Sequence, residues 1–394
     1  MRIGPHRLDR VELAGSLGDL GTLLPLAIAL ITVNGLSFTA VFLLVGLFYV
    51  ASGLYYRLPV PVQPLKVVAA VALATPETIT PPVIAATGLL IGIILLLLGV
   101  TGMIERLARL FAPPIIRGIQ FGLGFILVVK GLELMIDPAL FLGGRGEPHL
   151  GPFPLNAWIG VGGAVVALFL LSSRRFPAAL VLIGLGVVLA VPFHTAAGAA
   201  WAFGPSPLPL ALPGADELAT AAVLLVVPQL PLTVGNAALG TEDVARTLFG
   251  RDAPIERANA RRFTISMGFA NVAAGALTAM PMCHGAGGLA AHYRFGARTG
   301  GSNLIIGVLL VGVALVFGRT GIYLLSSIPN AVLGLLLLFA GLELALLVRD
   351  VTEKRDLFVV LLIGGVGLAT TNMSAALVAG IVLYYLLRWG KMDV

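Results

Sequence analysis

The sequence contains two short proline-containing stretches, Pro59-Val-Pro-Val-Gln-Pro64 and, later, Met280-Pro-Met-Cys283. A proline lacks a backbone donor and favours extended backbone in the residue before it, so each stretch predicts an extended segment. Each leads into a helix-compatible run, residues 62–75 and 285–293. These runs are too short to cross a bilayer, which needs about 20 residues. We therefore expect two half-helices, each entered through a broken backbone.

The composition around these stretches is that of an integral membrane protein. Of 394 residues, 58% are hydrophobic and 11% are charged, and the mean hydropathy is +1.01. A soluble domain cannot bury that much apolar surface. Fourteen spans of about 20 residues use about 280 residues, so no room remains for a soluble catalytic domain. The 49 glycines and 25 prolines indicate close helix packing and helix breaks, which point towards transport.

Twelve further apolar runs, bounded by glycine, proline or charge, predict membrane spans. With the two half-helices they predict an all-α integral membrane fold of fourteen segments, in which the half-helices are segments 3 and 10. The twelve predicted spans cover residues 13–33, 36–56, 80–100, 115–136, 155–172, 178–192, 218–240, 262–280, 302–318, 322–348, 355–371 and 374–389.

The distribution of lysine and arginine agrees with this count. If the N-terminus is inside, 21 of the 25 basic residues fall in cytoplasmic connections or ends, and only Arg145 and Arg319 fall outside. We therefore expect both termini in the cytoplasm. Because topology explains the net charge of +6, we expect no nucleic-acid partner. Trp158, Trp201 and Trp389 lie near predicted span ends, where interfacial anchors are expected.

An internal repeat supports the same organisation. Gly131-Leu-Glu-Leu134 recurs as Gly341-Leu-Glu-Leu344, 210 residues later, and the two half-helix prolines, Pro61 and Pro281, are 220 residues apart. Seven passes per repeat is an odd number, so the second copy is inverted in the membrane. We expect a first repeat over residues 1–205 and a second over 206–394.

The starts of the two half-helices predict a site for an anion. Opposed half-helices of inverted-repeat transporters meet near the bilayer midplane, where free N–H groups and helix dipoles favour negative charge. Alternatively, Lys66 reaches an interface or pairs with a carboxylate, His284 is a satisfied core histidine, and the glycines only permit packing. The residues expected at this site are Gln63, Lys66, Cys283, His284, Gly285, Ala286 and Gly287.

Other polar residues fall within the predicted spans. Gln229, Thr233 and Asn236 share one helical face, which is expensive against lipid and is expected to line the cavity, or else to form interhelical hydrogen bonds. Thr22 is a further substrate-binding candidate. Three carboxylates are candidates for carrying coupled protons, although Glu133 can instead pair with Lys130. These carboxylates are Asp19, Glu133 and Glu343.

Three segments resemble the molybdate transporter family, a branch of the sulfate permease superfamily. They are Pro61-Val-Gln-Pro-Leu-Lys66, Gln229-Leu-Pro-Leu-Thr233 with Asn236, and Ala279-Met-Pro-Met-Cys-His-Gly-Ala-Gly-Gly-Leu-Ala-Ala-His-Tyr-Arg-Phe-Gly-Ala-Arg298. The resemblance implies the seven-plus-seven inverted repeat of that superfamily, a core and a gate domain that move relative to each other, and substrate between segments 3 and 10. We expect no cytoplasmic STAS domain after Val394.

The resemblance implies a secondary transporter that takes up molybdate by alternating access. We expect it in the bacterial inner (plasma) membrane, with tungstate as a second substrate, protons as the coupling ion and a possible homodimer. The inside-negative potential opposes dianion entry, so accumulation needs co-transported cations or exchange. We expect no cofactor and no metal other than molybdenum within the oxyanion.

Other interpretations remain open at this point. The substrate can be sulfate or another oxyanion. A nucleobase permease shares the architecture but is expected to place a carboxylate where this chain has Gln229. An intramembrane metalloenzyme would use Cys283, His284 and His292, which lack the further ligands that zinc needs.

Overall fold

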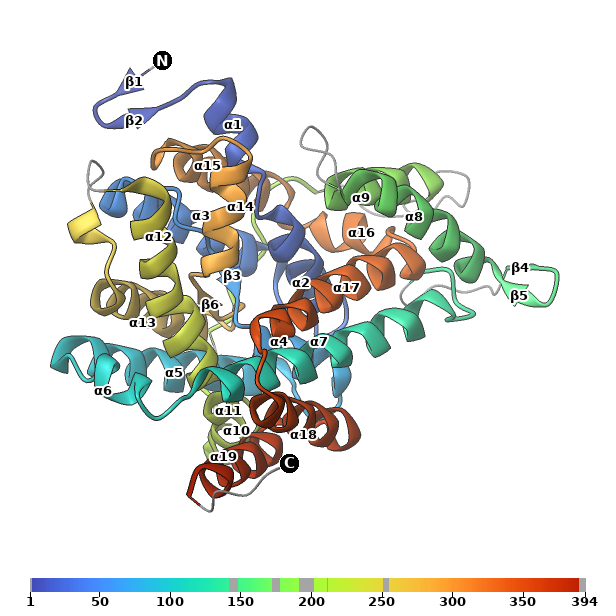
Figure 1. The fold of residues 1–394 in the computed structure, drawn as a ribbon. Helices are drawn as coiled ribbons and strands as arrows, with labels where there is room; N and C mark the ends of the chain where they lie inside the picture. The colour runs from blue at the N-terminus through green and yellow to red at the C-terminus, as the bar shows by residue number, and fades with distance from the viewer. Residues whose placement is uncertain are drawn as a thin grey trace.

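A computed structural model describes residues 2–141, 148–171, 178–190, 202–210, 212–250 and 255–389, and these are mostly helical (Figure 1). The first repeat expected from the sequence contains the helices α1 (Arg10–Ser16), α2 (Leu20–Thr32), α3 (Phe38–Tyr56), α4 (Lys66–Ala74), α5 (Pro81–Thr101), α6 (Ile104–Ala108), α7 (Pro113–Met135), α8 (Leu155–Leu171) and α9 (Ala178–Ala190).

The second half of the chain continues with α10 (Ala215–Ala221), α11 (Val227–Leu232), α12 (Thr241–Phe249), α13 (Ala260–Ala276), α14 (Ala286–Arg294), α15 (Gly301–Phe317), α16 (Gly321–Ser326), α17 (Asn330–Ala345), α18 (Lys354–Thr370) and α19 (Met373–Trp389). Short π-helical and 3-10 segments join some of these helices: η2 (Ala222–Val226), η3 (Thr233–Gly240), η4 (Ile255–Arg257) and η5 (Leu346–Asp350). The strands are pairs of residues: β1 (Arg2–Ile3), β2 (His6–Arg7), β3 (Gln63–Pro64), β4 (His149–Leu150), β5 (Phe153–Pro154) and β6 (Met282–Cys283).

Five helices in the described part of the chain are long and apolar enough to cross a membrane, and the bent pair α1 and α2 would make a sixth. The five are α3, α5, α7, the continuous helix from α10 to α12, and α17 with η5. Several further apolar helices are shorter, among them α8, α9, α15 and α19. Leu97, Phe169 and Val308 are exposed on these helices, as lipid-facing side chains would be.

Three predicted spans differ from the helices observed. The span 13–33 is bent by 45° between α1 and α2, with Gly18 and Asp19 at the break. The span 322–348 is divided between α16 and α17 at Pro329, because proline disfavours helical backbone in the residue before it. The span 218–240 is longer than expected, since helical backbone runs from Ala215 to Phe249.

The two proline-containing stretches form short extended strands, as the sequence predicts. β3 and β6 pair antiparallel, with Gln63 opposite Cys283 and Pro64 opposite Met282. The Leu65 N–H donates to the Pro281 carbonyl at 3.0 Å, which extends the pairing to the start of α4. The nine-residue helices α4 and α14 follow these strands, so both begin at one place in the fold.

Long helices from the two halves of the chain pack in pairs. α7 lies along α17, α3 along α15, and α5 along α13. In the first pair, Gly124 faces Gly341 and Gly131 faces Gly334, so closely that a Cβ atom on Gly124 would lie 2.6 Å from the Gly341 carbonyl oxygen. Glycine therefore brings the two backbones together at two levels of this helix pair.

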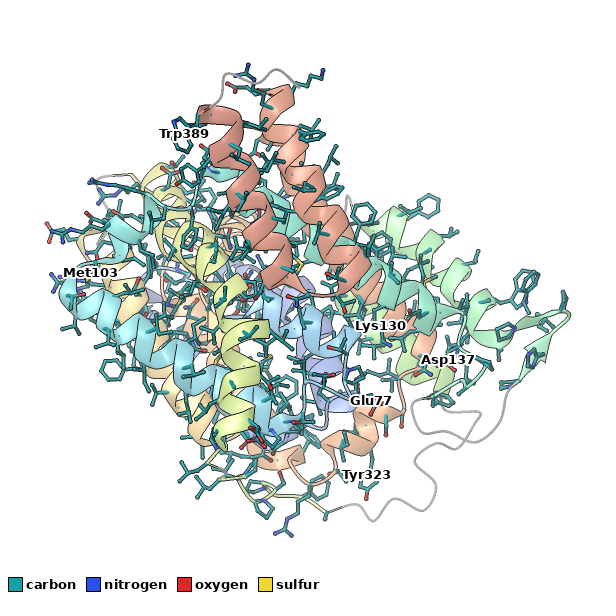
Figure 2. All side chains as sticks on the ribbon, turned by 90° about the horizontal axis from the view of Figure 1, so that it is seen from below. Glu77, Met103, Lys130, Asp137, Tyr323 and Trp389 are labelled. Atoms are coloured by element: carbon teal, nitrogen blue, oxygen red, sulfur yellow. The ribbon has the colours of Figure 1, made fainter. Side chains whose placement is uncertain are left out.

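α18 and α19 pack against α7 at one side of the molecule (Figure 1). Figure 2 shows Trp389 at the end of α19, where the side chain is 90% exposed. The Trp158 indole N–H donates to the Leu150 carbonyl at 3.0 Å, whereas Trp201 lies outside the described residues.

Candidate functional site: a cavity at the starts of two short helices

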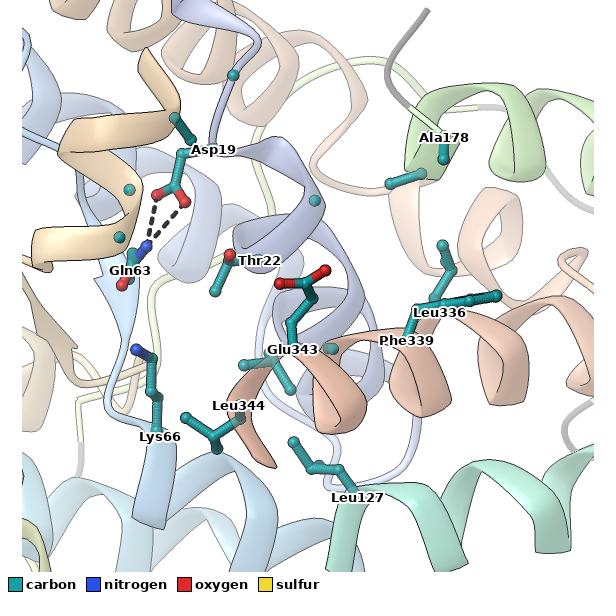
Figure 3. Close-up of a pocket in the computed structure, with 18 of the residues that line it drawn as sticks. Asp19, Thr22, Gln63, Lys66, Leu127, Ala178, Leu336, Phe339, Glu343 and Leu344 are labelled. Atoms are coloured by element: carbon teal, nitrogen blue, oxygen red, sulfur yellow. Dashed lines mark hydrogen bonds between the residues drawn. The ribbon is translucent and has the colours of Figure 1, made fainter. Parts of the chain in front are cut away.

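A cavity of about 360 Å³ lies between two groups of helices (Figure 3). One wall is formed by the break between α1 and α2, the start of α4, and α14. The other wall is formed by α7, α8, α9 and α17, whose side chains here are almost all apolar. The residues around the cavity include Asp19, Thr22, Gln63, Lys66, Gly287 and Gly288 on the first wall and Leu127, Leu182, Leu336, Phe339, Glu343 and Leu344 on the second.

Asp19 and Gln63 form a buried hydrogen-bonded pair on the first wall. Gln63 Nε2 donates to both carboxylate oxygens of Asp19, at 2.7 and 2.9 Å, and each residue is 2% exposed. Gln63 Oε1 has no hydrogen-bond partner among the described residues. A Cβ atom at Gly288 would lie 2.5 Å from Gln63 Nε2 and 2.7 Å from Asp19 Oδ2, so the pair rests directly on the first turn of α14.

The start of α14 is open. Its N-cap residue is Gly285, and no side chain caps the first turn. Gly287 and Gly288 line the cavity, and a Cβ atom at Gly287 would meet nothing within 4 Å. Uncapped N–H groups at a helix N-terminus favour an anion, so this turn can donate hydrogen bonds to one.

The start of α4 is closed by a side chain. Gln229 Oε1, from α11, accepts the Val67 N–H at 2.9 Å, and Gln229 Nε2 donates to Thr233 at 3.1 Å. The structure thus brings Gln229 and Thr233 together, as their predicted common face requires, but against α4 rather than around the cavity. Asn236 lies in η3 and does not line the cavity either.

Lys66 is the residue of α4 that lines the cavity. Its side chain is partly buried and points from the first residue of α4 towards Gln63 (Figure 3). No carboxylate of the described chain lies within ion-pair distance of its ammonium group. Its positive charge therefore remains available to a ligand.

The residues just before α14 lie outside the cavity. Cys283 is buried, with its Sγ 3.7 Å from the Pro64 carbonyl oxygen. His284 Nδ1 lies 2.9 Å from the Pro61 carbonyl oxygen and Nε2 lies 3.0 Å from Ser266 Oγ. The imidazole also stacks on Phe48. These contacts are those of a satisfied core histidine. Gly285 and Ala286 are likewise not part of the cavity lining.

The candidate coupling carboxylates have different surroundings. Asp19 is buried on the polar wall, and Glu343 enters the cavity from α17 as an exposed side chain (Figure 3). Glu133 is exposed away from the cavity and pairs with Lys130 at 3.2 Å. Glu133 therefore forms an ion pair with Lys130 and does not face the cavity.

The apolar wall was not among the residues predicted from the sequence. Leucines and phenylalanines inside apolar spans carry no pattern that separates cavity-facing from lipid-facing positions. Gly288 belongs to the glycine run quoted above, but its contact with Asp19 depends on the α1–α2 break. Within the described residues no three His, Cys, Asp or Glu side chains converge as metal ligands, so the metalloenzyme interpretation finds no support there.

Comparison with known proteins places this chain in a family. A family model described as "Molybdate transporter of MFS superfamily" matches residues 11–127 and 221–344, more than half of the chain. The chain belongs to the molybdate transporter family. It is 32% identical to molybdate transporter 2 of Arabidopsis thaliana, over 97% of this chain and 88% of that protein. It is also 32% identical to molybdate transporter 1 of the same plant, over 97% of this chain and 89% of that protein.

Solved structures show the same fold. The transmembrane domain of a cyanobacterial bicarbonate transporter, BicA, superposes with a TM-score of 0.65 and 19% identity, over 95% of this chain and 97% of that chain. The murine anion transporter Slc26a9, in its inward-facing state, superposes with a TM-score of 0.70 and 15% identity, over the whole of this chain and 70% of that chain. This member of the molybdate transporter family therefore has the fold of sulfate-permease-type membrane transporters, and it is a transporter rather than an enzyme.

Proposed function

We propose that this protein is a secondary active transporter that takes up molybdate by alternating access, with tungstate as a second substrate and protons as the coupling ion. The observation that carries the proposal is the cavity in which Lys66 and the open first turn of α14 lie on one polar wall. The molybdate transporters of Arabidopsis to which the chain is similar support the choice of anion.

The two positive elements of the wall contribute unequally to binding. An exposed helix N-terminus stabilises an anion by about 0.3–1 kcal/mol, and by up to about 2 kcal/mol when partly buried. A unit charge about 4 Å from another contributes about 4 kcal/mol at the effective dielectric near a protein surface. Lys66 therefore provides most of the attraction for a dianion, whereas Gly287 and Gly288 provide directed N–H donors that orient the oxyanion.

Asp19 is the group that best explains coupling to protons. A dianion entering the cavity meets the Asp19 carboxylate, so protonating that carboxylate removes a repulsion and favours joint binding of proton and anion. Among the described residues, the ionisable groups that interact with Asp19 include Lys66, Tyr49 from α3 and Cys283 from β6. An inside-negative potential opposes the anion by about 2.3 kcal/mol per charge per 100 mV, so accumulation needs co-transported cations or exchange.

The proposed architecture is the fourteen-segment inverted repeat, with residues 1–205 and 206–394 as its halves. Its best support is the pairing of α7 with α17. At the repeat offset of 210 residues, Gly334 is the counterpart of Gly124, and Gly341 is the counterpart of Gly131. Gly124 contacts Gly341 and Gly131 contacts Gly334, so each glycine of α7 packs against the counterpart of the other one. Crosswise contacts of this kind are what a two-fold axis between repeats produces.

The cavity divides the helices into two bodies under this proposal. α1 to α5 and α10 to α15 form a core that carries Lys66 and α14, whereas α7 to α9 and α17 to α19 form a gate with an apolar face. Relative movement of the two bodies would expose the polar wall to each side of the membrane in turn. Phe295 and Leu347 line the cavity close to Arg294 and Arg349, which supports a cavity open to the cytoplasm.

The proposed location is a bacterial inner (plasma) membrane, with both termini cytoplasmic and with a homodimer as the proposed assembly. The arginine distribution supports this orientation. The C-terminal residues 390–394 lie outside the described part of the chain.

Uptake by proteoliposomes tests the function. We expect labelled molybdate to accumulate when an inward proton gradient is imposed, and excess tungstate to compete more strongly than sulfate, bicarbonate or uracil. Equal competition by sulfate would make the protein a general oxyanion transporter, and competition by uracil alone would make it a nucleobase permease.

Variants of two of the three candidate carboxylates test the coupling. Asp19→Asn should remove the dependence of uptake on the proton gradient, whereas Glu133→Gln should retain it because Glu133 lies away from the cavity. Uptake that depends on an imposed sodium gradient but not on a proton gradient would contradict protons as the coupling ion.

A further inference from the structure

The break between α1 and α2 lies along one face of α14. Gly15 packs against Ala297, just beyond the end of α14, and a Cβ atom at Gly18 would lie 2.8 Å from the Ala291 carbonyl oxygen. Asp19 packs against Gly288 in the first turn of α14. The chain therefore runs past α14 in a continuous seam that ends at the Asp19 carboxylate.

His292 supplies a polar link across this seam. Its Nδ1 lies 2.7 Å from the Gly15 carbonyl oxygen, and because a carbonyl only accepts, Nδ1 carries the hydrogen. The Gly15 carbonyl also accepts the Gly18 N–H at 3.0 Å, so this oxygen holds both the turn at the break and the His292 ring. The imidazole is fully buried and edge-on to Tyr49, whose ring centroid lies 6.2 Å away.

His292 is placed to act on the site through this contact. It lies one helical turn after Gly288, on the helix whose first turn offers the N–H donors. The Gly15 carbonyl lies at the end of α1, and Asp19 is the N-cap residue of α2. This hydrogen bond is therefore a direct side-chain tie from the helix that carries the anion donors to the segment that carries the carboxylate, beside the bonds that Glu12 of α1 accepts from residues after α14.

We propose that His292 is a positioning residue for Asp19. It holds the α1–α2 break against α14, so that the carboxylate and the Gly287 and Gly288 amides keep one geometry and move together. The substrate part of this inference rests on the proposed function, whereas the positioning part concerns the fold of this chain alone.

Three substitutions separate the hydrogen bond from the volume of the ring. His292→Leu removes the donor. His292→Asn places an amide nitrogen near the position of Nδ1, and His292→Gln places one near the position of Nε2, which has no partner among the described residues. We therefore expect asparagine, but not glutamine, to restore the wild-type behaviour.

The first measurement needs no substrate. Hydrogen–deuterium exchange of the purified protein should be faster in the segment 15–23 for His292→Leu and His292→Gln than for wild type and His292→Asn. Exchange in α18, which packs mainly against α7 and α19, should be the same in all four proteins and reports that each is folded. Unchanged exchange in the segment 15–23 of the leucine and glutamine variants would overturn the proposal.

The second measurement is a double-mutant cycle on molybdate binding, combining His292→Leu with Asp19→Asn. Loss of one net hydrogen bond, about 1 kcal/mol, predicts roughly a five- to tenfold weaker affinity for His292→Leu. The same substitution should cost less than about twofold when Asp19 is already asparagine.

Equal losses in both backgrounds would assign His292 to general structural support and would overturn the proposal. A wild-type protein that binds no molybdate would refute the proposed function instead, and the exchange measurement would still decide whether His292 holds the break.

Discussion

The starts of α4 and α14 follow similar stretches of sequence, but they differ in capping and in the groups that they present to the cavity. Both helices follow a proline-containing strand, and the two strands pair. In α4 the Val67 N–H donates to Gln229, so the first turn has a partner within the protein and the helix contributes the Lys66 side chain instead. In α14 the first turn has no cap and its glycines face the cavity. Under the proposed inverted repeat, two equivalent helix starts would thus contribute differently to a one-sided site, with charge from α4 and N–H donors from α14.

Removing the charge contributed by α4 should have the largest effect. Lys66→Ala deletes the positive charge facing the anion, and losing one partner of a buried charge pair costs about 2–5 kcal/mol, or at least about thirtyfold in affinity. Lys66→Arg should recover part of the loss because the charge remains. Equilibrium binding of labelled molybdate measures both variants. If Lys66→Ala bound molybdate with wild-type affinity, α4 would not contribute to the binding site.

Filling the first turn of α14 should have the next largest effect. Gly288→Ala places a methyl group 2.5 Å from Gln63 Nε2 and 2.7 Å from Asp19 Oδ2. Overpacking of this kind costs about 1–3 kcal/mol, because the neighbouring groups must move. We expect molybdate affinity to fall by about ten- to a hundredfold. Gly287→Ala matches this change in backbone entropy and helix propensity, but its methyl group meets no protein atom within 4 Å and enters the cavity instead. Wild-type affinity in Gly288→Ala would contradict the contact of α14 with Asp19 and Gln63 as a determinant of binding.

Removing the cap of α4 should affect stability more than binding. Gln229→Ala leaves the Val67 N–H without its partner, and loss of a helix cap costs about 1 kcal/mol of stability. Thermal unfolding should therefore show the change, while the affinity for molybdate should stay within about threefold. A tenfold loss of affinity with unchanged unfolding would make Gln229 a substrate ligand, as its position in the sequence first suggests.

The smallest expected effect concerns Cys283, just before α14. The sequence alone suggests a thiol beside the anion, but the residue is 3% exposed and its sulfur faces the Pro64 carbonyl. A hydrophilic maleimide should label the wild-type protein slowly, and molybdate should leave the rate unchanged. Rapid labelling that molybdate prevents would place the thiol at the cavity and would extend the site back into β6.

Much of the fold follows from local patterns in the sequence. Prolines at 61, 64 and 281 predict the extended segments, and the short runs after them are the helices α4 and α14. Lys66, Gln63 and Gly287 lie at the cavity because they occupy or adjoin the starts of those helices. A residue next to a helix terminus is positioned by local geometry, which a sequence pattern reports directly.

The remaining features depend on contacts between distant helices. Gln229 meets α4, and His284 turns towards Ser266 in α13, only because particular helix faces pack together. The spans are apolar around their whole circumference, so hydrophobic periodicity does not reveal which faces meet. The apolar wall contributed by α7 and α17, with Leu127 and Phe339, is invisible to sequence patterns for the same reason.

The position of molybdenum in the bound protein tests the one-sided site most directly. Molybdenum scatters anomalously, so a crystal grown with molybdate locates the metal without reference to the shape of the cavity. The account predicts one anomalous peak between Lys66 and the first turn of α14, with oxyanion oxygens within hydrogen-bonding distance of the Gly287 and Gly288 amides. A peak at the start of α4, with Gln229 displaced from Val67, or a peak midway between the two helix starts would contradict it.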